Sequence, residues 1–384
     1  MRKALRVIAL CLMPLLLTGC WSYKSLGEIA IVLGMSVDKV SPDSDFIVSM
    51  EIADLTKSPK EGSPGSKQVE ASGKTIFEAV RDTKRRLDSR AYLGNMQIVA
   101  IGEHMARETG IKGAIDWTMR DAEVRETLNM LVFRGGEAMS MFKSEGTDQV
   151  LVSLAADSII TNDNKITSSL AHKDLYLVYD ILYGRGKSLT LPAFHIVENA
   201  GAKVIEADGT AAFKEDKLVG FLSPEESKYF LIATGECHGG ILALALKGTG
   251  KPDTSLEISS SSVKTSFTNN GGKLAFRIET ETDVYLAETM ADIDVMKEDQ
   301  IKALEEEAGK RLELEINALI KRVQTELKTD IFGFGLIIHQ RDLALWRQVE
   351  NQWDTYFETL PISVSCKVNI KNTAYITSKE DIKF

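Results

Sequence analysis

A long amphipathic stretch, residues 297–328, limits most strongly what this chain can fold into. Its apolar stripe consists of Ile301, Leu304, Ala308, Leu312, Ile316, Leu319, Val323 and Leu327. This spacing of three or four positions places the stripe on one face of a helix. At a rise of 1.5 Å per residue, that helix extends over roughly 45 Å. It therefore needs a long apolar surface, and we expect the sheet that precedes it to supply one.

Two strands precede this helix and one follows it. Residues 263–267 and 274–278 alternate apolar and polar side chains, as half-buried strands do. Between them, Asn269-Asn270-Gly271-Gly272 favours a hairpin turn, because Asn and Gly tolerate positive φ. A last apolar strand is expected at residues 362–370. The sequence thus predicts a C-terminal α+β unit with the long helix packed on its sheet.

The first part of the chain mixes strands and helices. Apolar or alternating runs predict strands at residues 29–37, 46–53, 96–101 and 128–133. Helices are expected near residues 74–89 and 111–119, and a mobile loop rich in Pro, Gly, Ser and Lys at residues 57–67. This alternation indicates a sheet covered by helices.

A smaller unit follows in the middle of the chain. Residues 210–222 favour a hairpin, and Ser223 with Glu226 forms a capping box that starts a helix. Gly235 is expected to end that helix, and residues 241–246 to form a buried strand before a linker.

The predicted fold class is α+β, with three domains and mixed or antiparallel sheets covered by helices. The boundaries give an N-terminal α+β domain at residues 20–200, a small middle α+β domain at 201–252 and a C-terminal domain at 253–384 that contains the long helix.

The start of the chain predicts where the protein is located. Three basic residues precede an apolar run of about 11 residues, the layout of a secretory signal peptide and too short to span a bilayer. The run ends in Leu17-Thr18-Gly19-Cys20, which resembles the bacterial lipobox. Residues 1–19 are therefore predicted to be a lipoprotein signal peptide, cleaved between Gly19 and Cys20. Cys20 would carry an S-diacylglycerol and an N-acyl chain, tethering an extracytoplasmic protein to the membrane. An ordinary signal peptide with a chance cysteine is the alternative.

Charge excludes some partners. The net charge is −9, and it becomes −12 when the three basic residues of the signal peptide are removed. This acidic balance argues against nucleic acid as a partner. It also argues against electrostatic adhesion to anionic lipid headgroups.

The cysteines do not predict a disulfide framework. Cys11 leaves with the signal peptide and Cys20 is the acylated residue, so that Cys237 and Cys366 remain. They could pair in an oxidising compartment, but isolated thiols in a long chain are more often simply buried.

No catalytic constellation stands out. Residues 184–188 include Gly-Lys-Ser, but a P-loop needs a further Gly where this chain has Ile181, so a basic turn is the better interpretation. The five histidines are scattered without zinc-binding spacing, and no Gly-x-Ser-x-Gly motif occurs. Acidic residues are abundant and no pair is singled out. We predict no enzyme, no catalytic or metal-binding residue and no cofactor.

Ordered motifs occur along nearly the whole chain after residue 19. They are Cys20-Trp21, Glu28-Ile29-Ala30-Ile31-Val32 with Val37-Asp38-Lys39, Arg120-Asp121-Ala122-Glu123-Val124-Arg125, Gly209-Thr210-Ala211-Ala212-Phe213, Leu218-Val219-Gly220-Phe221-Leu222, and Asp330-Ile331-Phe332-Gly333-Phe334-Gly335 followed by Trp346 and Trp353. In series they resemble the Ger(x)C family, the lipoprotein C subunits of nutrient germinant receptors in endospore-forming bacteria.

The resemblance implies a non-enzymatic, three-domain α+β protein. It implies two integral membrane subunits of the same receptor as partners, at the outer face of the inner spore membrane. There the assembly responds to small nutrients and triggers germination. From the residues themselves, we expect Phe332, Phe334, Trp346 and Trp353 to be core aromatics, and Gly333 and Gly335 to permit a tight turn or close packing.

Two other functions stay open at this point. One is a lipid-anchored solute-binding protein that captures the nutrient itself. The other is an envelope hydrolase that uses a pair of carboxylates.

Overall fold

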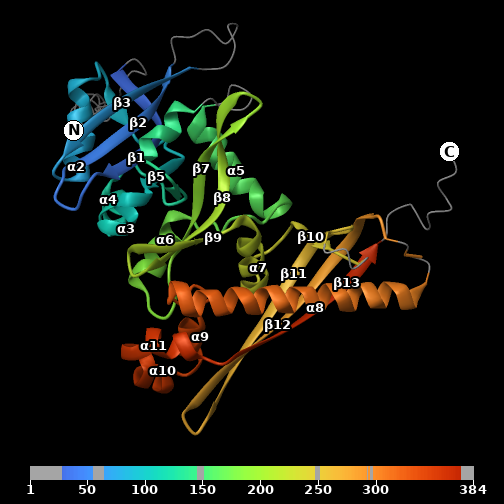
Figure 1. The fold of residues 1–384 in the computed structure, drawn as a ribbon. Coiled ribbons are helices and arrows are strands. Elements are labelled where there is room, and N and C mark those ends of the chain that lie inside the picture. Colours follow the sequence, from blue (N-terminus) through green and yellow to red (C-terminus); the bar gives the residue numbers. More distant parts are fainter. Residues whose placement is uncertain are drawn as a thin grey trace, which may run out of the picture.

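The computed structural model describes residues 28–54, 65–144, 151–246, 251–291, 293–294 and 297–372. Within these residues the strands form one sheet of nine strands and one of four, each with helices packed on it (Figure 1). The predicted α+β class is confirmed.

The larger sheet is mixed. Its order is β3-β2-β1-β5-β6-β7-β8-β9, with β4 also paired to β1. The strands are β1 (Ile29–Lys39), β2 (Phe46–Asp54), β3 (Gly65–Gly73), β4 (Arg90–Tyr92), β5 (Ile98–Gly102), β6 (Asn129–Phe133), β7 (Thr190–Asn199), β8 (Ala202–Lys214) and β9 (Lys217–Leu222). The central strands β1, β5, β6 and β7 are parallel, whereas the strands at both ends pair antiparallel.

Helices cover both faces of this sheet, so its central strands are buried on both sides. In β5, Val99 and Ile101 belong to one core cluster, and Ile98 and Ala100 to the other. The first cluster includes residues of α2 (Ile76–Asp82), α3 (Glu103–Glu108), α4 (Lys112–Arg120) and α6 (Leu175–Tyr183). The second includes residues of the 3₁₀ helix η5 (Ala138–Lys143) and of α5 (Val152–Ile166).

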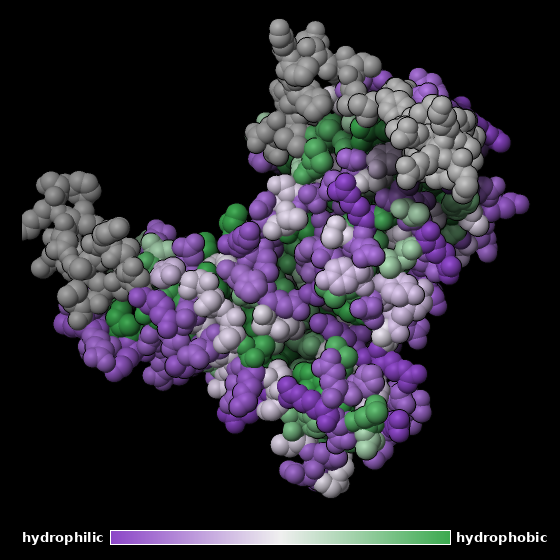
Figure 2. Space-filling view, turned by 180° about the vertical axis from the view of Figure 1, so that it is seen from behind, coloured by the Kyte–Doolittle hydropathy of each residue, from purple (hydrophilic) through white to green (hydrophobic). Residues whose placement is uncertain are grey.

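The smaller sheet carries the long helix. Its order is β10 (Ile241–Leu244), β11 (Thr254–Asn270), β12 (Lys273–Thr289) and β13 (Ile362–Asn372). Alternate residues of β12, such as Phe276 and Ile278, share a core cluster with α7 (Pro224–Thr234) and α8 (Glu298–Arg322). The predicted packing of the long helix on this sheet is therefore confirmed. The opposite face is largely hydrophilic (Figure 2).

The predicted hairpin turn and the predicted start and end of the middle helix are confirmed. The hairpin turn lies at Gly271 and Gly272, both with positive φ, and pairs Asn270 with Lys273. Ser223 and Glu226 form both hydrogen bonds of the capping box that starts α7, and Gly235 ends the helix in the left-handed conformation.

The long helix does more than cover the sheet face, because it also lies along the outer strand β13. Glu313 Oε1 accepts a hydrogen bond from Cys366 N at 3.0 Å, and Glu305 Oε1 accepts one from Ile370 N at 2.7 Å. Gly309 lies between these two glutamates, and a Cβ there would be only 2.7 Å from Cys366 O. The helix thus supplies acceptors to a strand edge that would otherwise face solvent.

After α8 the chain continues through a π-helical turn, η7 (Val323–Leu327), so the helical stretch matches the predicted one closely. It then forms α9 (Phe334–Arg341), α10 (Leu343–Val349), the 3₁₀ helix η8 (Glu350–Gln352) and α11 (Trp353–Thr359) before β13.

Some boundaries differ from those predicted. The helix expected at residues 74–89 is shorter, because α2 ends at Asp82 and a 3₁₀ turn, η4 (Thr83–Arg85), follows. Part of the loop expected at 57–67 belongs to β3, and residues 55–64 lie outside the described residues.

The predicted domain boundary at 200/201 falls in the turn between β7 and β8. These two strands pair with each other, so the nine-stranded sheet continues across it. The division into three domains stays a prediction.

Candidate functional site

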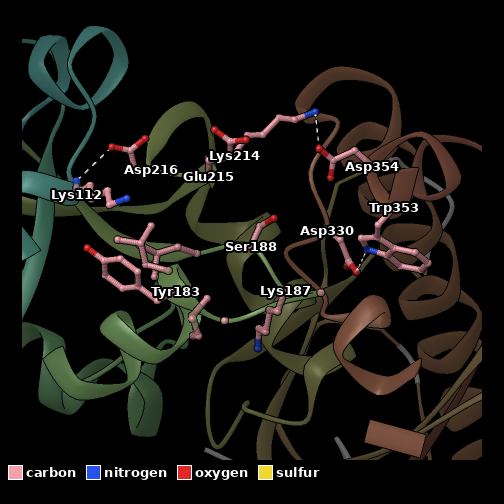
Figure 3. A pocket seen from close by; sticks show the side chains of 15 residues that line it. Lys112, Tyr183, Lys187, Ser188, Lys214, Glu215, Asp216, Asp330, Trp353 and Asp354 are labelled. Carbon is pink, nitrogen blue, oxygen red and sulfur yellow. Dashed lines mark hydrogen bonds and ion pairs between the residues drawn. The ribbon is translucent and has the colours of Figure 1, made fainter. Parts of the chain in front are cut away.

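The last of the sequence motifs forms a closed loop around the carboxylate of Asp330, which is 1% exposed. Its Oδ1 accepts a hydrogen bond from Gly333 N at 2.8 Å. Its Oδ2 accepts from Gly335 N at 2.9 Å. It also accepts from Trp353 Nε1 at 3.0 Å (Figure 3). The Asp, the two Gly and the last Trp of this motif are therefore one hydrogen-bond acceptor and its three donors.

This loop packs on the connection between α6 and β7. Leu336 N donates to Gly186 O at 2.6 Å, and Ser188 N donates to Asp330 O at 2.8 Å. A Cβ on Gly335 would lie 2.8 Å from Gly186 Cα and 2.6 Å from Trp353 Nε1. The basic turn at residues 184–188 is thus the surface that receives the C-terminal loop.

The aromatic residues of the same segment lie in the core, as predicted. Phe332, Phe334, Trp346 and Trp353 are each less than 9% exposed. Phe334 has its ring centroid 4.8 Å from that of Phe276 in β12 and 5.6 Å from that of Phe332. They fasten the loop to the four-stranded sheet and do not form a ligand cage.

A cavity of about 350 Å³ opens beside this junction. Figure 3 places Lys112, Tyr183 and Asp216 on one side of it and Asp330, Trp353 and Asp354 on the other. Lys214 forms an ion pair with Asp354 at 2.9 Å, which links the β8–β9 hairpin to α11. The cavity therefore lies between parts of the chain that belong to the two sheets, and it contains charges of both signs.

The two buried charged groups near the cavity, those of Asp330 and Lys187, already have partners. Burial raises the pKa of the Asp330 carboxyl to about 6, against the effect of the N–H donors that stabilise its charge. Burial also lowers the pKa of the Lys187 amine. The carboxylate of Glu236, with Oε1 3.8 Å from Lys187 Nζ, acts in the opposite direction and raises this pKa. Because every oxygen of Asp330 has donors, this carboxylate holds the loop and is not free to act as a general base.

Two further motif acids have the same kind of role. Asp38 is 4% exposed and accepts hydrogen bonds from Ala138 N and Met139 N, at 2.7 and 3.0 Å. Glu123 accepts one from Leu93 N at 3.1 Å and pairs with Arg90. These acids fix the backbone of segments distant in sequence, a role that the sequence alone did not reveal.

The remaining candidate chemistry is sparse. Over the described ranges, no three His, Cys, Asp or Glu side chains gather closely enough to hold a metal ion. Cys237 and Cys366 are both free thiols, so they are not paired with each other. Burial raises the pKa of both, that of Cys366 to about 11, so neither is an activated thiolate.

The predicted lipidation site, Cys20, and the cleavage position after Gly19 lie outside the described residues. Among the helices that the structure describes, none is both long and apolar enough to cross a membrane.

Comparison with known proteins defines the class. The fold is similar to that in the crystal structure of the GerBC protein, with a TM-score of 0.56 and 21% identity over 88% of this chain and 97% of that one. Two relatives from Bacillus subtilis (strain 168) match almost end to end. Spore germination protein B3 is 25% identical, covering 97% of this chain and 98% of its own length. Spore germination protein KC is 23% identical, covering 97% and 96%.

Two family models divide the chain between them. The model described as spore germination protein N-terminal domain matches residues 22–196, and the one described as spore germination B3/GerAC like, C-terminal, matches residues 208–374. The chain belongs to this family of spore germination proteins, the C subunits of germinant receptors. The resemblance drawn from the motifs is confirmed.

Proposed function

We propose that this chain is a lipid-anchored, non-enzymatic subunit of a nutrient germinant receptor in the inner spore membrane, needed for the germination response. The observation that carries the non-enzymatic role is the Asp330 loop. Within the hexapeptide Asp330–Gly335 the one carboxylate, that of Asp330, accepts hydrogen bonds from three donors of the same loop, which supports a structural role for it.

The anchor is Cys20, held at the outer face of the membrane beside two integral membrane subunits of the same receptor. The tetrapeptide Leu17-Thr18-Gly19-Cys20 and the basic, apolar segment before it support this assignment. In this arrangement the described part of the chain is a tethered scaffold beside its partners.

A Cys20→Ala variant tests the anchor. We expect spores of this variant to lose the protein from the membrane fraction after a high-salt wash, which removes peripherally bound protein, and to respond poorly to one nutrient. Cys366→Ala, which removes a thiol elsewhere, should stay in the membrane fraction. Normal fractionation and germination of the Cys20→Ala spores would contradict the proposal.

Capture of the nutrient by this chain is the second candidate. The cavity of about 350 Å³ favours it, because Lys112 and Asp216 offer charges of both signs to a zwitterion. Calorimetry of the purified chain against candidate nutrients separates the two functions. Tight, saturable binding supports capture, whereas the scaffold role predicts no heat of binding.

A further inference from the structure

A second cavity lies between α2 and α4, two helices that lie side by side on the nine-stranded sheet. It has a volume of about 690 Å³. We call it the α2–α4 groove. Its apolar lining includes Phe77 and Trp117. Three arginines (Arg81, Arg90 and Arg120) and three acids (Asp116, Asp121 and Glu123) also line it, and Arg90 pairs with Glu123 and Arg120 with Asp116. Phe77 is 51% exposed, and the Arg81 guanidinium lies 4.8 Å from the centre of its ring. The groove therefore combines a large exposed aromatic side chain with charges that balance, and a positive excess comes only from the segment beside it.

The segment that forms one wall of this groove is basic, although the chain as a whole is acidic. Residues 74–90 contain six basic and three acidic residues, while the whole chain has a net charge of −9. Arg85 and Arg86 share one carboxylate, that of Asp82, and their side chains are 81% and 52% exposed. The local excess of positive charge is thus accessible to solvent.

The groove also lies close to where the described chain begins. Arg90 in β4 is the register partner of Ile29 in β1. Glu28 is the eighth residue after Cys20, and an extended chain spans at most about 3.4 Å per residue, or roughly 27 Å in all. With one more residue to Ile29 and the spacing between paired strands, a lipid on Cys20 keeps the Arg90 end of the groove within about 35 Å of the membrane surface.

We propose that the α2–α4 groove and its basic wall dock on an anionic phospholipid surface. Headgroup phosphates are bound by Arg81, Arg85 and Arg86, and Phe77 enters the boundary between headgroups and acyl chains. Its position beside the membrane rests on the proposed lipidation of Cys20. Docking at this second point orients the chain, which a lipid tether by itself does not do.

The acidic net charge of the chain predicts no adhesion to anionic lipids. The local charge of residues 74–90 predicts adhesion, and the short distance over which charges act in salt decides between the two. At physiological salt the Debye length is about 8 Å, so charges on the far side of the molecule are screened from the membrane. Three net positive charges at an anionic surface raise binding on the order of a hundredfold. The local balance of residues 74–90 decides the interaction.

Vesicle flotation of the full mature chain carrying Cys20→Ala tests the docking proposal. This chain has no acyl group, so any binding to vesicles comes from the protein surface. We expect binding to phosphatidylcholine vesicles only when they contain phosphatidylglycerol, and loss of binding at high salt. Arg85→Glu with Arg86→Glu should lower binding at least about tenfold. Phe77→Ala should lower it severalfold without changing its dependence on salt.

Lys302→Glu with Lys310→Glu is the matched control. It makes the same change of charge on exposed positions of α8, 68% and 63% exposed, and should leave vesicle binding unchanged. An equal loss in both double variants, equal binding to neutral vesicles, or capture of a soluble partner without any vesicle binding would overturn the proposal.

The experiments can contradict the anchor proposal and the groove proposal independently of each other. If the unlipidated chain ignores anionic vesicles while the Cys20→Ala spores still lose the protein, the groove proposal fails and the anchor stands. If the unlipidated chain binds vesicles but Cys20→Ala spores keep the protein after the salt wash, the anchor fails and the groove stands.

Discussion

Asp330 is the residue on which the C-terminal loop depends. Replacing it by Asn keeps the shape but turns one acceptor oxygen into an NH₂ donor, which faces N–H donors of Gly333, Gly335 or Trp353. Leaving such donors unsatisfied in the core costs about 1–3 kcal/mol each, so Asp330→Asn should lower the free energy of unfolding by about 2–4 kcal/mol. Denaturant unfolding at neutral pH measures this. Asp354→Asn, at a half-exposed ion pair, should change it by no more than about 0.5 kcal/mol, and an equal effect of both variants would contradict the assigned role.

The same carboxyl gives a pH dependence with a definite sign. Its pKa is raised from 3.8 to about 6 in the folded chain, so between these values the folded state holds a proton that the unfolded state has released. Stability from this group is therefore fully present at low pH and is lost as pH rises through about 6. The difference in unfolding free energy between wild type and Asp330→Asn should be larger at about pH 4.5 than at pH 7. A difference that does not change with pH would show that the folded pKa is not raised.

At the scale of single elements, α8 and β13 form the most testable pair. Removing the acceptors with Glu305→Ala and Glu313→Ala leaves Cys366 N and Ile370 N without their partners and exposes a strand edge. We expect a loss of about 1 kcal/mol for each hydrogen bond, and self-association detected by sedimentation, because an open edge pairs with other strands. Glu306→Ala removes an exposed glutamate that pairs only with Lys310 on the same helix and should leave the chain unassociated. Self-association in that control would argue against edge protection.

Elements whose signals are local were the ones that the sequence predicted well. The stripe of α8, the Gly271-Gly272 turn and the Ser223 capping box each depend on residues within a few positions of one another. The missed elements lack such signals. β7 contains Pro192, which counts against a strand, and β3 exposes most of its side chains. α6 is a nine-residue, mostly apolar run that periodicity does not assign to helix or strand.

At the scale of the whole molecule, the junction between the sheets could not be predicted. Gly186 and Gly335 are far apart in the sequence, and neither glycine by itself reveals that the other must approach it. The motif aromatics were correctly placed in the core because they are large and apolar. The partners of Asp330 were missed because hydrogen bonds between distant segments leave no periodic pattern.

Gly186→Ala should weaken the junction. Gly186 has a φ of +78°, and a Cβ there would lie 2.4 Å from Gly335 C, so the substitution adds backbone strain and a clash. We expect a loss of about 2–4 kcal/mol and thermal unfolding in two steps, one for each sheet with its helices. Gly135→Ala has a similar φ of +81° but open space around the Cβ, and should show only the strain, about 1–2 kcal/mol, with unfolding unchanged in form. Two-step unfolding of both variants, or of neither, would contradict this.

The contact between Gly186 and Gly335 also has a mechanical meaning. Side chains between two bodies can change rotamer and absorb a small movement, but here main chain meets main chain, and Leu336 N binds Gly186 O directly. A displacement of the nine-stranded sheet is passed on to α9 without a compliant layer between them. We therefore expect the turn at Gly186 and the start of α9 to move together and not independently.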